Sequence, residues 1–153
     1  MSLHADIPAV AIQVSRDVVV ASIQVDLDEE VLARFREDLL RRIHETGSRG
    51  VILDVSGLET LDSAEFAALR RIITMSTIMG AESVLVGLRP GVVSALIEAG
   101  ADVDGLRAAI NLDAAYALLQ PEPEADSEAE ADGDAGQEDD LPPESEPMPG
   151  DER

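Results

Sequence analysis

Hydrophobic and polar positions alternate between strand-like and helix-like periods along the first 120 residues. Two β-branched runs, at 7–14 and 17–25, meet at "SRD" and predict a hairpin or two adjacent antiparallel strands. The apolar period then becomes about 3.6 residues over 28–47, which predicts a helix with acids in its first turn and arginines near its end. Gly47 is the expected C-cap of this helix.

Further along the chain, short apolar runs again alternate with segments of helical period. Residues 50–57 lack polar alternation, which is typical of a strand buried on both faces. A second helix is predicted from the end of "LETLD" to Gly80, and Pro90 begins a third, shorter helix that ends at Gly100. The other expected elements are a buried strand at 82–87, an edge strand at 105–110, and a closing helix at 112–119 capped by Asp113 or Asn111.

This order of elements predicts the α/β fold class. Successive strand–helix–strand units imply a mostly parallel sheet with right-handed crossovers. We therefore expect a single sheet of about four or five strands, layered with about four helices, within residues 1–120.

The composition changes sharply near Gln120. Residues 121–153 contain 14 Asp/Glu, one Arg and six of the eight prolines, so their formal charge is −13. Such a segment cannot bury enough apolar surface to offset the entropy of ordering it. We therefore predict one folded domain, 1–120, followed by an acidic, proline-rich disordered tail, 121–153.

The charge of the chain argues against several function classes. The net charge is −21 and every basic residue is an arginine. Because phosphate backbones and anionic lipids both require a basic face, we expect neither nucleic acid nor a membrane as a partner. The sequence shows no signal peptide, and no apolar run approaches the roughly 20 residues that span a bilayer. A cytoplasmic location is expected.

The groups that would support catalysis are few. The absence of cysteine removes thiol nucleophiles and thiolate metal ligands. His4 and His44 have no visible Ser–His–Asp arrangement, and nothing resembles a phosphate-binding loop. The paired acids Asp26/Asp28 and Glu29/Glu30 occur where carboxylates favour a helix start. We expect no enzyme activity, no metal site and no cofactor.

The segment "LDSAEF", at 61–66, lies where a predicted strand gives way to the second helix. Asp62 can act as the N-cap, and Glu65 can complete a capping box, so helix structure explains both acids. That box does not require Ser63. As the first helical residue, Ser63 would present its hydroxyl at the sheet edge where ligands and partners of open α/β folds bind. The spacing leaves two interpretations open, a helix-start residue or a functional hydroxyl.

A phosphate on Ser63 would be compatible with the predicted fold. The free N–H groups and the dipole of a helix N-terminus favour an anion by roughly 0.3–1 kcal/mol. A docked partner would respond differently, because the phosphate adds about −1.5 to −2 charges beside Asp62 and Glu65. If the partner places an acidic group nearby, a loss of 2–4 kcal/mol weakens binding by roughly 30- to 1,000-fold.

Two stretches, "VILDVSGLETLDSAEF" and "ITMSTIMGAESVLVGLRPGVVSALIEAGAD", resemble the STAS-domain family of anti-sigma-factor antagonists. Within that family the chain is similar to the RsbS-like branch, over about 7–119. The resemblance implies a STAS fold, which agrees with the order of elements above. It also implies that Ser63, flanked by the capping residues Asp62 and Glu65, is the phosphoacceptor.

For an RsbS-like protein the resemblance implies a non-enzymatic scaffold of the bacterial stressosome. The unphosphorylated chain would sequester an RsbT-type serine/threonine switch kinase. Phosphorylation of Ser63 would release that kinase into a general stress and sigma-factor pathway, and a separate phosphatase would reset the serine. The other implied partners are an RsbR-like STAS co-scaffold and further copies of the chain, in a large oligomer.

The sequence departs from the family pattern in two places. Related proteins often have a second phosphorylated Thr in the third helix, but Ala95 occupies that place here, and only Ser94 beside it offers a hydroxyl. The acidic tail is also unusual, and it is interpreted either as a solubilising extension or as a competitor for a basic partner surface. Arg70 and Arg71, on the same helix as Ser63, fit either an interface or ordinary solvated positions.

Two alternative functions stay open at this stage. A free RsbV-like antagonist would bind an anti-sigma kinase one-to-one and would not enter a large assembly. A small-molecule-binding STAS module or weak enzyme would require a pocket at the sheet edge, and the sequence shows no polar cluster that would build one.

Overall fold

The computed structural model describes residues 9–121. The strands are β1 (Ala11–Ser15), β2 (Val18–Ser22), β3 (Gly50–Asp54), β4 (Glu82–Val86) and β5 (Ala108–Ala109). The helices are α1 (Glu29–Thr46), α2 (Ser63–Ile78), α3 (Pro90–Glu98) and α4 (Leu112–Leu119). This is the order of strands and helices that the hydrophobic pattern predicts.

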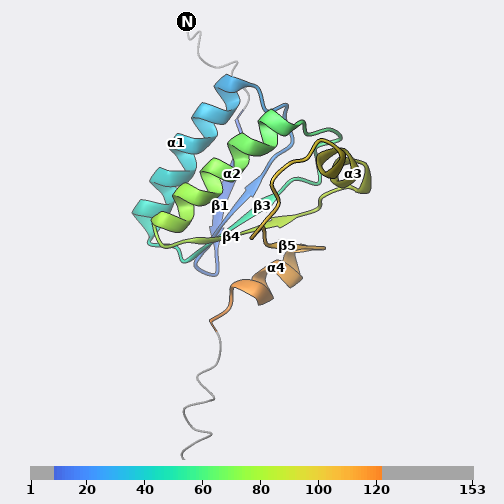
Figure 1. The fold of residues 1–153 in the computed structure, drawn as a ribbon. Helices are drawn as coiled ribbons and strands as arrows, with labels where there is room; N and C mark the ends of the chain where they lie inside the picture. Colours follow the sequence, from blue (N-terminus) through green and yellow to red (C-terminus); the bar gives the residue numbers. More distant parts are fainter. Residues whose placement is uncertain (1–8, 122–153) are drawn as a thin grey trace, which may run out of the picture. The chain divides into compact units, whose positions relative to one another are not determined.

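The five strands form one sheet in the order β1-β2-β3-β4-β5 (Figure 1). Strand β1 pairs with β2 in antiparallel fashion, and the other three pairs are parallel. Each parallel pair is joined by one helix, as the strand–helix–strand pattern requires. The predicted α/β class with a mostly parallel sheet is therefore confirmed.

The helices cover the two faces of the sheet unequally. On one face, α1 and α2 run side by side and α3 lies next to them, whereas α4 lies on the other face (Figure 1). The larger core forms between the sheet and α1–α3, and the buried stripe of α1 contributes Val31, Phe35, Leu39 and Ile43 to it. The smaller core places Ala115 and Leu119 of α4 against strand residues that face the opposite way, such as Ile52.

The β1–β2 hairpin has a tighter turn than "SRD" indicates, because Ser15 still pairs with Val18. Only Arg16 and Asp17 form the turn, and both have positive φ, at 55° and 64°. Two left-handed residues give the turn the twist that a two-residue hairpin needs. The Arg16 guanidinium lies 4.7 Å from the centroid of the Tyr116 ring, so the turn also packs against α4.

The structure near the end of the domain identifies the N-cap of α4 and shows that the last strand is shorter than expected. Asn111 is the N-cap of α4, since its Oδ1 accepts a hydrogen bond from Ala114 N at 2.8 Å, whereas Asp113 lies within the first turn. The edge strand expected at 105–110 is only two residues long. Ile110 is 86% exposed and does not extend it, because the chain turns there toward α4.

Several sequence-based predictions fall outside residues 9–121. The tail that is expected to be disordered, 121–153, lies there apart from Pro121, and its disorder stays a prediction. His4 also lies outside the described residues. No helix in the described part of the chain is long and apolar enough to cross a membrane.

Candidate functional site

The loop between β3 and α2 carries Ser63 from the C-terminal edge of the sheet to the start of a helix. The loop is anchored in the larger core by Val55, Leu58 and Leu61, which are all buried. Val55 N also donates a hydrogen bond of 2.9 Å to Val86 O on the neighbouring strand. The position of Ser63 is therefore fixed by apolar contacts before the helix begins.

A complete capping box begins α2. Asp62 Oδ1 accepts a hydrogen bond from Glu65 N at 2.7 Å, and Glu65 Oε1 accepts one from Asp62 N at 3.0 Å. Both side chains thus bind backbone donors that the helix itself leaves unpaired. The capping box explains why Asp62 and Glu65 are acids, but it does not require a serine at position 63.

Ser63 is the first residue of α2 and its side chain is exposed. Among the hydrogen bonds of residues 9–121, none involves the Ser63 hydroxyl or the N–H groups of Ser63 and Ala64. The Ser63 hydroxyl and two backbone N–H groups, which have no hydrogen-bond partner among these residues, therefore lie close together at a helix N-terminus. This arrangement is accessible to another protein and suits an anion.

The first part of the same loop is held by polar contacts from both sides. Asp54 Oδ1 accepts hydrogen bonds from Ser56 N at 3.0 Å and from Ser56 Oγ at 2.7 Å. Arg89, at the start of α3, donates from Nε and Nη2 to Ser56 O at 3.1 and 3.0 Å. The β3–α2 loop is thus tied to the β4–α3 turn, a link that sequence reasoning did not find.

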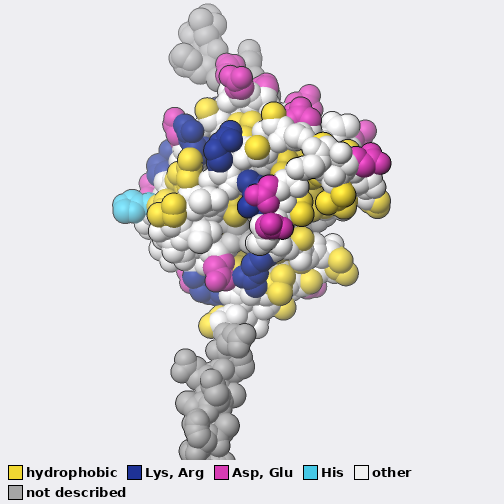
Figure 2. All heavy atoms as spheres, viewed as in Figure 1, with side chains coloured by type: hydrophobic (Ala, Val, Ile, Leu, Met, Phe, Trp, Pro, Cys, Tyr) yellow, Lys and Arg dark blue, Asp and Glu magenta, His cyan; other side chains and the backbone are white. Residues whose placement is uncertain are grey.

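A groove of about 550 Å³ lies between α1 and α2, and it reaches the start of α2 at Asp62 and Ala64. Its lining includes Arg36 from α1 and Arg71 from α2. Figure 2 shows basic side chains gathered over the region where these two helices run side by side. Arg36 was not singled out from the sequence, because only the packing of α1 on α2 brings it next to the second helix.

The remaining candidates from the sequence lie apart from this groove. Ser94 is exposed on α3, and His44 is exposed in the last turn of α1. Arg70, although adjacent to Arg71 in sequence, forms an ion pair of 3.5 Å with Asp102. Residues 9–121 contain no group of three or more His, Cys, Asp or Glu that could hold a metal ion.

A second hollow, of about 530 Å³, lies at the C-terminal edge of the sheet. It is lined by the ends of β3 and β4 and by the β5–α4 segment, including Asp54, Gly87 and Ile110. A small-molecule-binding STAS module would require a pocket at the sheet edge, and this hollow is a space of that kind. It does not include Ser63 or the capping box.

The fold and the site define a small α/β domain that presents one serine hydroxyl at the start of a helix. The chain belongs to the STAS-domain family, whose model matches residues 9–105.

Two solved structures resemble the chain at more than 30% identity. RsbS from Moorella thermoacetica, in a form with a serine replaced by glutamate, is 32% identical with a TM-score of 0.63, over 72% of this chain and 93% of that one. A chain from a structure of the stressosome, described as a signal integration and transduction hub, is 31% identical with a TM-score of 0.63, over 71% and 95%.

More distant structures share the fold. SpoIIAA of Bacillus, a cell fate determinant solved in its phosphorylated form, is 16% identical with a TM-score of 0.51, over 71% of this chain and 98% of that one. Among curated proteins, none matches this sequence.

Proposed function

We propose that this chain is a non-enzymatic stressosome scaffold of the RsbS type, in which phosphorylation of Ser63 controls the binding of an RsbT-type serine/threonine kinase. The observation that carries the proposal is the state of Ser63, an exposed hydroxyl without a hydrogen bond that lies between the two acids of a complete capping box. The unphosphorylated chain sequesters the kinase, and the phosphorylated chain releases it. A separate phosphatase restores the first state.

The comparisons support the scaffold over the free antagonist. Identity to RsbS and to the stressosome chain is 32% and 31%, whereas identity to the anti-sigma factor antagonist SpoIIAA in its unphosphorylated form is 19%. The RsbS structure carries glutamate in place of a serine, and SpoIIAA has been solved in a phosphorylated form.

The geometry explains how phosphorylation can change binding without unfolding the domain. A phosphate on Ser63 lies beside the free N–H groups of Ser63 and Ala64, which stabilise an anion by about 0.3–1 kcal/mol. The carboxylates of Asp62 and Glu65 are already near, so the phosphate makes this surface strongly negative. A partner carboxylate at about 4 Å would be repelled by about 4 kcal/mol per unit charge at an effective dielectric near 20.

The kinase interaction is tested by measuring the affinity of an RsbT-type kinase for four forms of the full-length chain. The forms are wild type, Ser63→Ala, Ser63→Glu and, as an exposed serine on another helix, Ser94→Glu. Wild type, Ser63→Ala and Ser94→Glu should bind alike, and Ser63→Glu should bind at least about 30-fold more weakly. Equal binding by Ser63→Glu and Ser94→Glu would contradict the proposed switch.

The scaffold role is tested separately, by the mass of the complex formed with an RsbR-like STAS protein. We expect an assembly of many copies, seen by light scattering or sedimentation. If the chain stays small with that protein but binds an anti-sigma kinase one-to-one, the RsbV-like alternative is correct. The proposed location is the cytoplasm, where the kinase would be found.

A further inference from the structure

The groove between α1 and α2 has an apolar floor, and several of the side chains that form its walls are small. Leu27 and Ile72 in its lining are each 3% exposed, and Leu32 and Met75 are half-buried. The wall residues of α1 and α2 include three alanines, Ala33, Ala64 and Ala68. Small side chains let a second backbone approach closely, so the groove suits a segment of another protein that carries apolar side chains.

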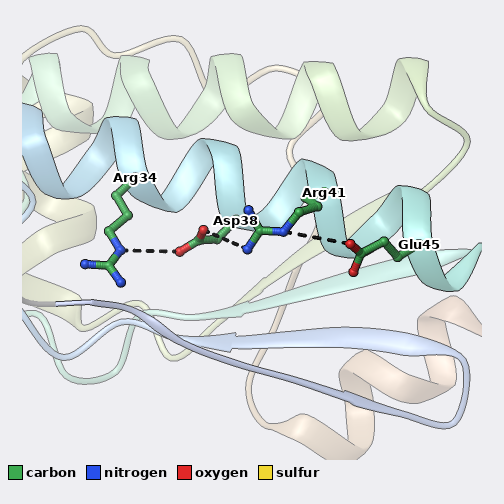
Figure 3. A network of polar contacts seen from close by, with 4 residues as sticks. All are labelled: Arg34, Asp38, Arg41 and Glu45. Carbon is green, nitrogen blue, oxygen red and sulfur yellow. Dashed lines mark hydrogen bonds and ion pairs between the residues drawn. The ribbon is translucent and has the colours of Figure 1, made fainter.

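The arginines outside this groove are mostly matched with acids. On the exposed side of α1, Arg34 Nε lies 3.6 Å from Asp38 Oδ2, and Arg41 Nη2 lies 3.1 Å from Asp38 Oδ1 (Figure 3). Arg41 also reaches Glu45, at 4.0 Å. With 32 acidic and 11 basic residues in the chain, such pairing is the expected state of an arginine.

Arg36 and Arg71 do not follow this rule. Each lines the groove from a different helix, and neither takes part in an ion pair or a side-chain hydrogen bond among residues 9–121. Two guanidinium groups without a carboxylate partner therefore face the same groove. A guanidinium presents a planar fork of donors that matches a carboxylate.

Four acids line the near end of the groove, and three of them accept hydrogen bonds from backbone N–H groups, whereas Glu29 does not. Asp28 Oδ1 accepts a hydrogen bond from Val31 N at 2.9 Å, and Asp62 and Glu65 form the capping box of α2. The positive ends of two helix dipoles partly offset these carboxylates. Farther along the groove, the two arginines are the charges without a counterpart.

We propose that the α1–α2 groove binds an acidic segment of the sequestered kinase, in which apolar side chains contact Leu32, Ile72 and Met75 and carboxylates bind Arg36 and Arg71. The inference rests on the proposed function and names the surface and the chemistry of its partner. Ser63 and Arg71 are eight residues apart on α2, about 12 Å along the helix axis. That distance exceeds the Debye length of about 8 Å, so a phosphate on Ser63 acts mainly on the near end of the groove, at Asp62 and Ala64, and only weakly on the arginines.

The first test measures the affinity of the kinase for charge-reversed variants of the full-length chain. Arg36→Glu and Arg71→Glu should each weaken binding by at least about 10-fold, because like charges then face each other across the interface. Arg34→Glu makes the same change in charge on α1 but outside the groove lining, and it should stay within about threefold of wild type. Thermal unfolding midpoints of all variants confirm that each one is folded.

The second test does not need the kinase. Two amphipathic peptides of about 14 residues share one leucine stripe, and two glutamates in the first are replaced by lysines in the second. In a titration followed by amide NMR shifts at 0.15 M salt, the glutamate peptide should bind wild type more tightly and perturb residues 28–36 and 62–75. The Arg36→Glu, Arg71→Glu double variant should reverse that preference, and Arg34→Glu should keep it.

The two tests separate the groove from the switch. If the kinase binds wild type and the groove variants equally, the groove is not its docking site, although the Ser63 switch can still hold. If no RsbT-type kinase binds the wild type, the proposed function fails and the peptides decide about the groove. A preference for the lysine peptide, or shifts centred outside the two helices, would overturn the inference.

Discussion

Gly87 holds the turn after β4 against the loop that carries Ser63, and its replacement by alanine tests that contact. A Cβ at this position would lie 2.6 Å from Ser56 Cβ and 3.0 Å from Ser56 Cα. The φ of Gly87 is also +86°, in the left-handed region. Ser56 is fixed by Asp54 and Arg89, so it cannot move aside without breaking hydrogen bonds.

The expected magnitude has two parts, and Gly100 separates them. Gly100 has a similar φ of +73°, but a Cβ there would meet nothing within 4 Å. Gly100→Ala should therefore cost only the left-handed backbone, about 1 kcal/mol. Gly87→Ala adds the steric clash, which typically costs 1–3 kcal/mol, and should lower the free energy of unfolding by about 3 kcal/mol in all.

Urea unfolding of the full-length chain measures both losses. Because the chain contains no tryptophan, far-UV circular dichroism is the suitable signal. For an m-value of about 1.5 kcal/mol/M, the midpoint should fall by about 2 M for Gly87→Ala and by less than about 1 M for Gly100→Ala. Equal midpoints for the two variants would show that the contact between Gly87 and Ser56 carries no stability, and would refute this reasoning.

Two further substitutions test the site and the core. Asp62→Ala removes the N-cap of α2 and should lower the free energy of unfolding by about 1 kcal/mol. Asp113→Ala is the control, because Asp113 does not cap a helix. Equal losses of stability in the two variants would contradict the role of the capping box. Leu39→Ala empties a fully buried site and should cost 2–5 kcal/mol, whereas Ile78→Ala, at an 80% exposed position, should change stability by less than about 0.5 kcal/mol. Denaturant midpoints check each pair.

Local sequence signals predict much of this fold because they act over a few residues. The stripe that begins at Val31 and the C-cap at Gly47 both follow from helical geometry, and Gly47 N donates to Ile43 O as a C-cap should. The two-residue turn at Arg16 and Asp17 was harder to predict from the sequence. Asp17 tolerates positive φ but Arg16 does not favour it, and the packing of Arg16 on Tyr116 joins positions 100 residues apart.

Part of the candidate site was also predictable from the local sequence, and part of it was not. The positions of Asp62, Ser63 and Glu65 follow from the spacing of four residues, so the helix start was predictable. The difference between Arg70 and Arg71 was not, because it depends on which one reaches Asp102 and which one faces α1. The groove exists only after α1 and α2 pack on the same face of the sheet, and no local pattern encodes that contact.

The most direct test of the central claim is the intact mass of the chain, with phosphosite mapping, after incubation with an RsbT-type kinase and ATP. Wild type should gain one phosphate at Ser63, and Ser63→Ala should gain none. If the kinase is active on another substrate and leaves wild type unmodified, or modifies Ser63→Ala equally, Ser63 is only a helix-start residue and the proposed switch is wrong.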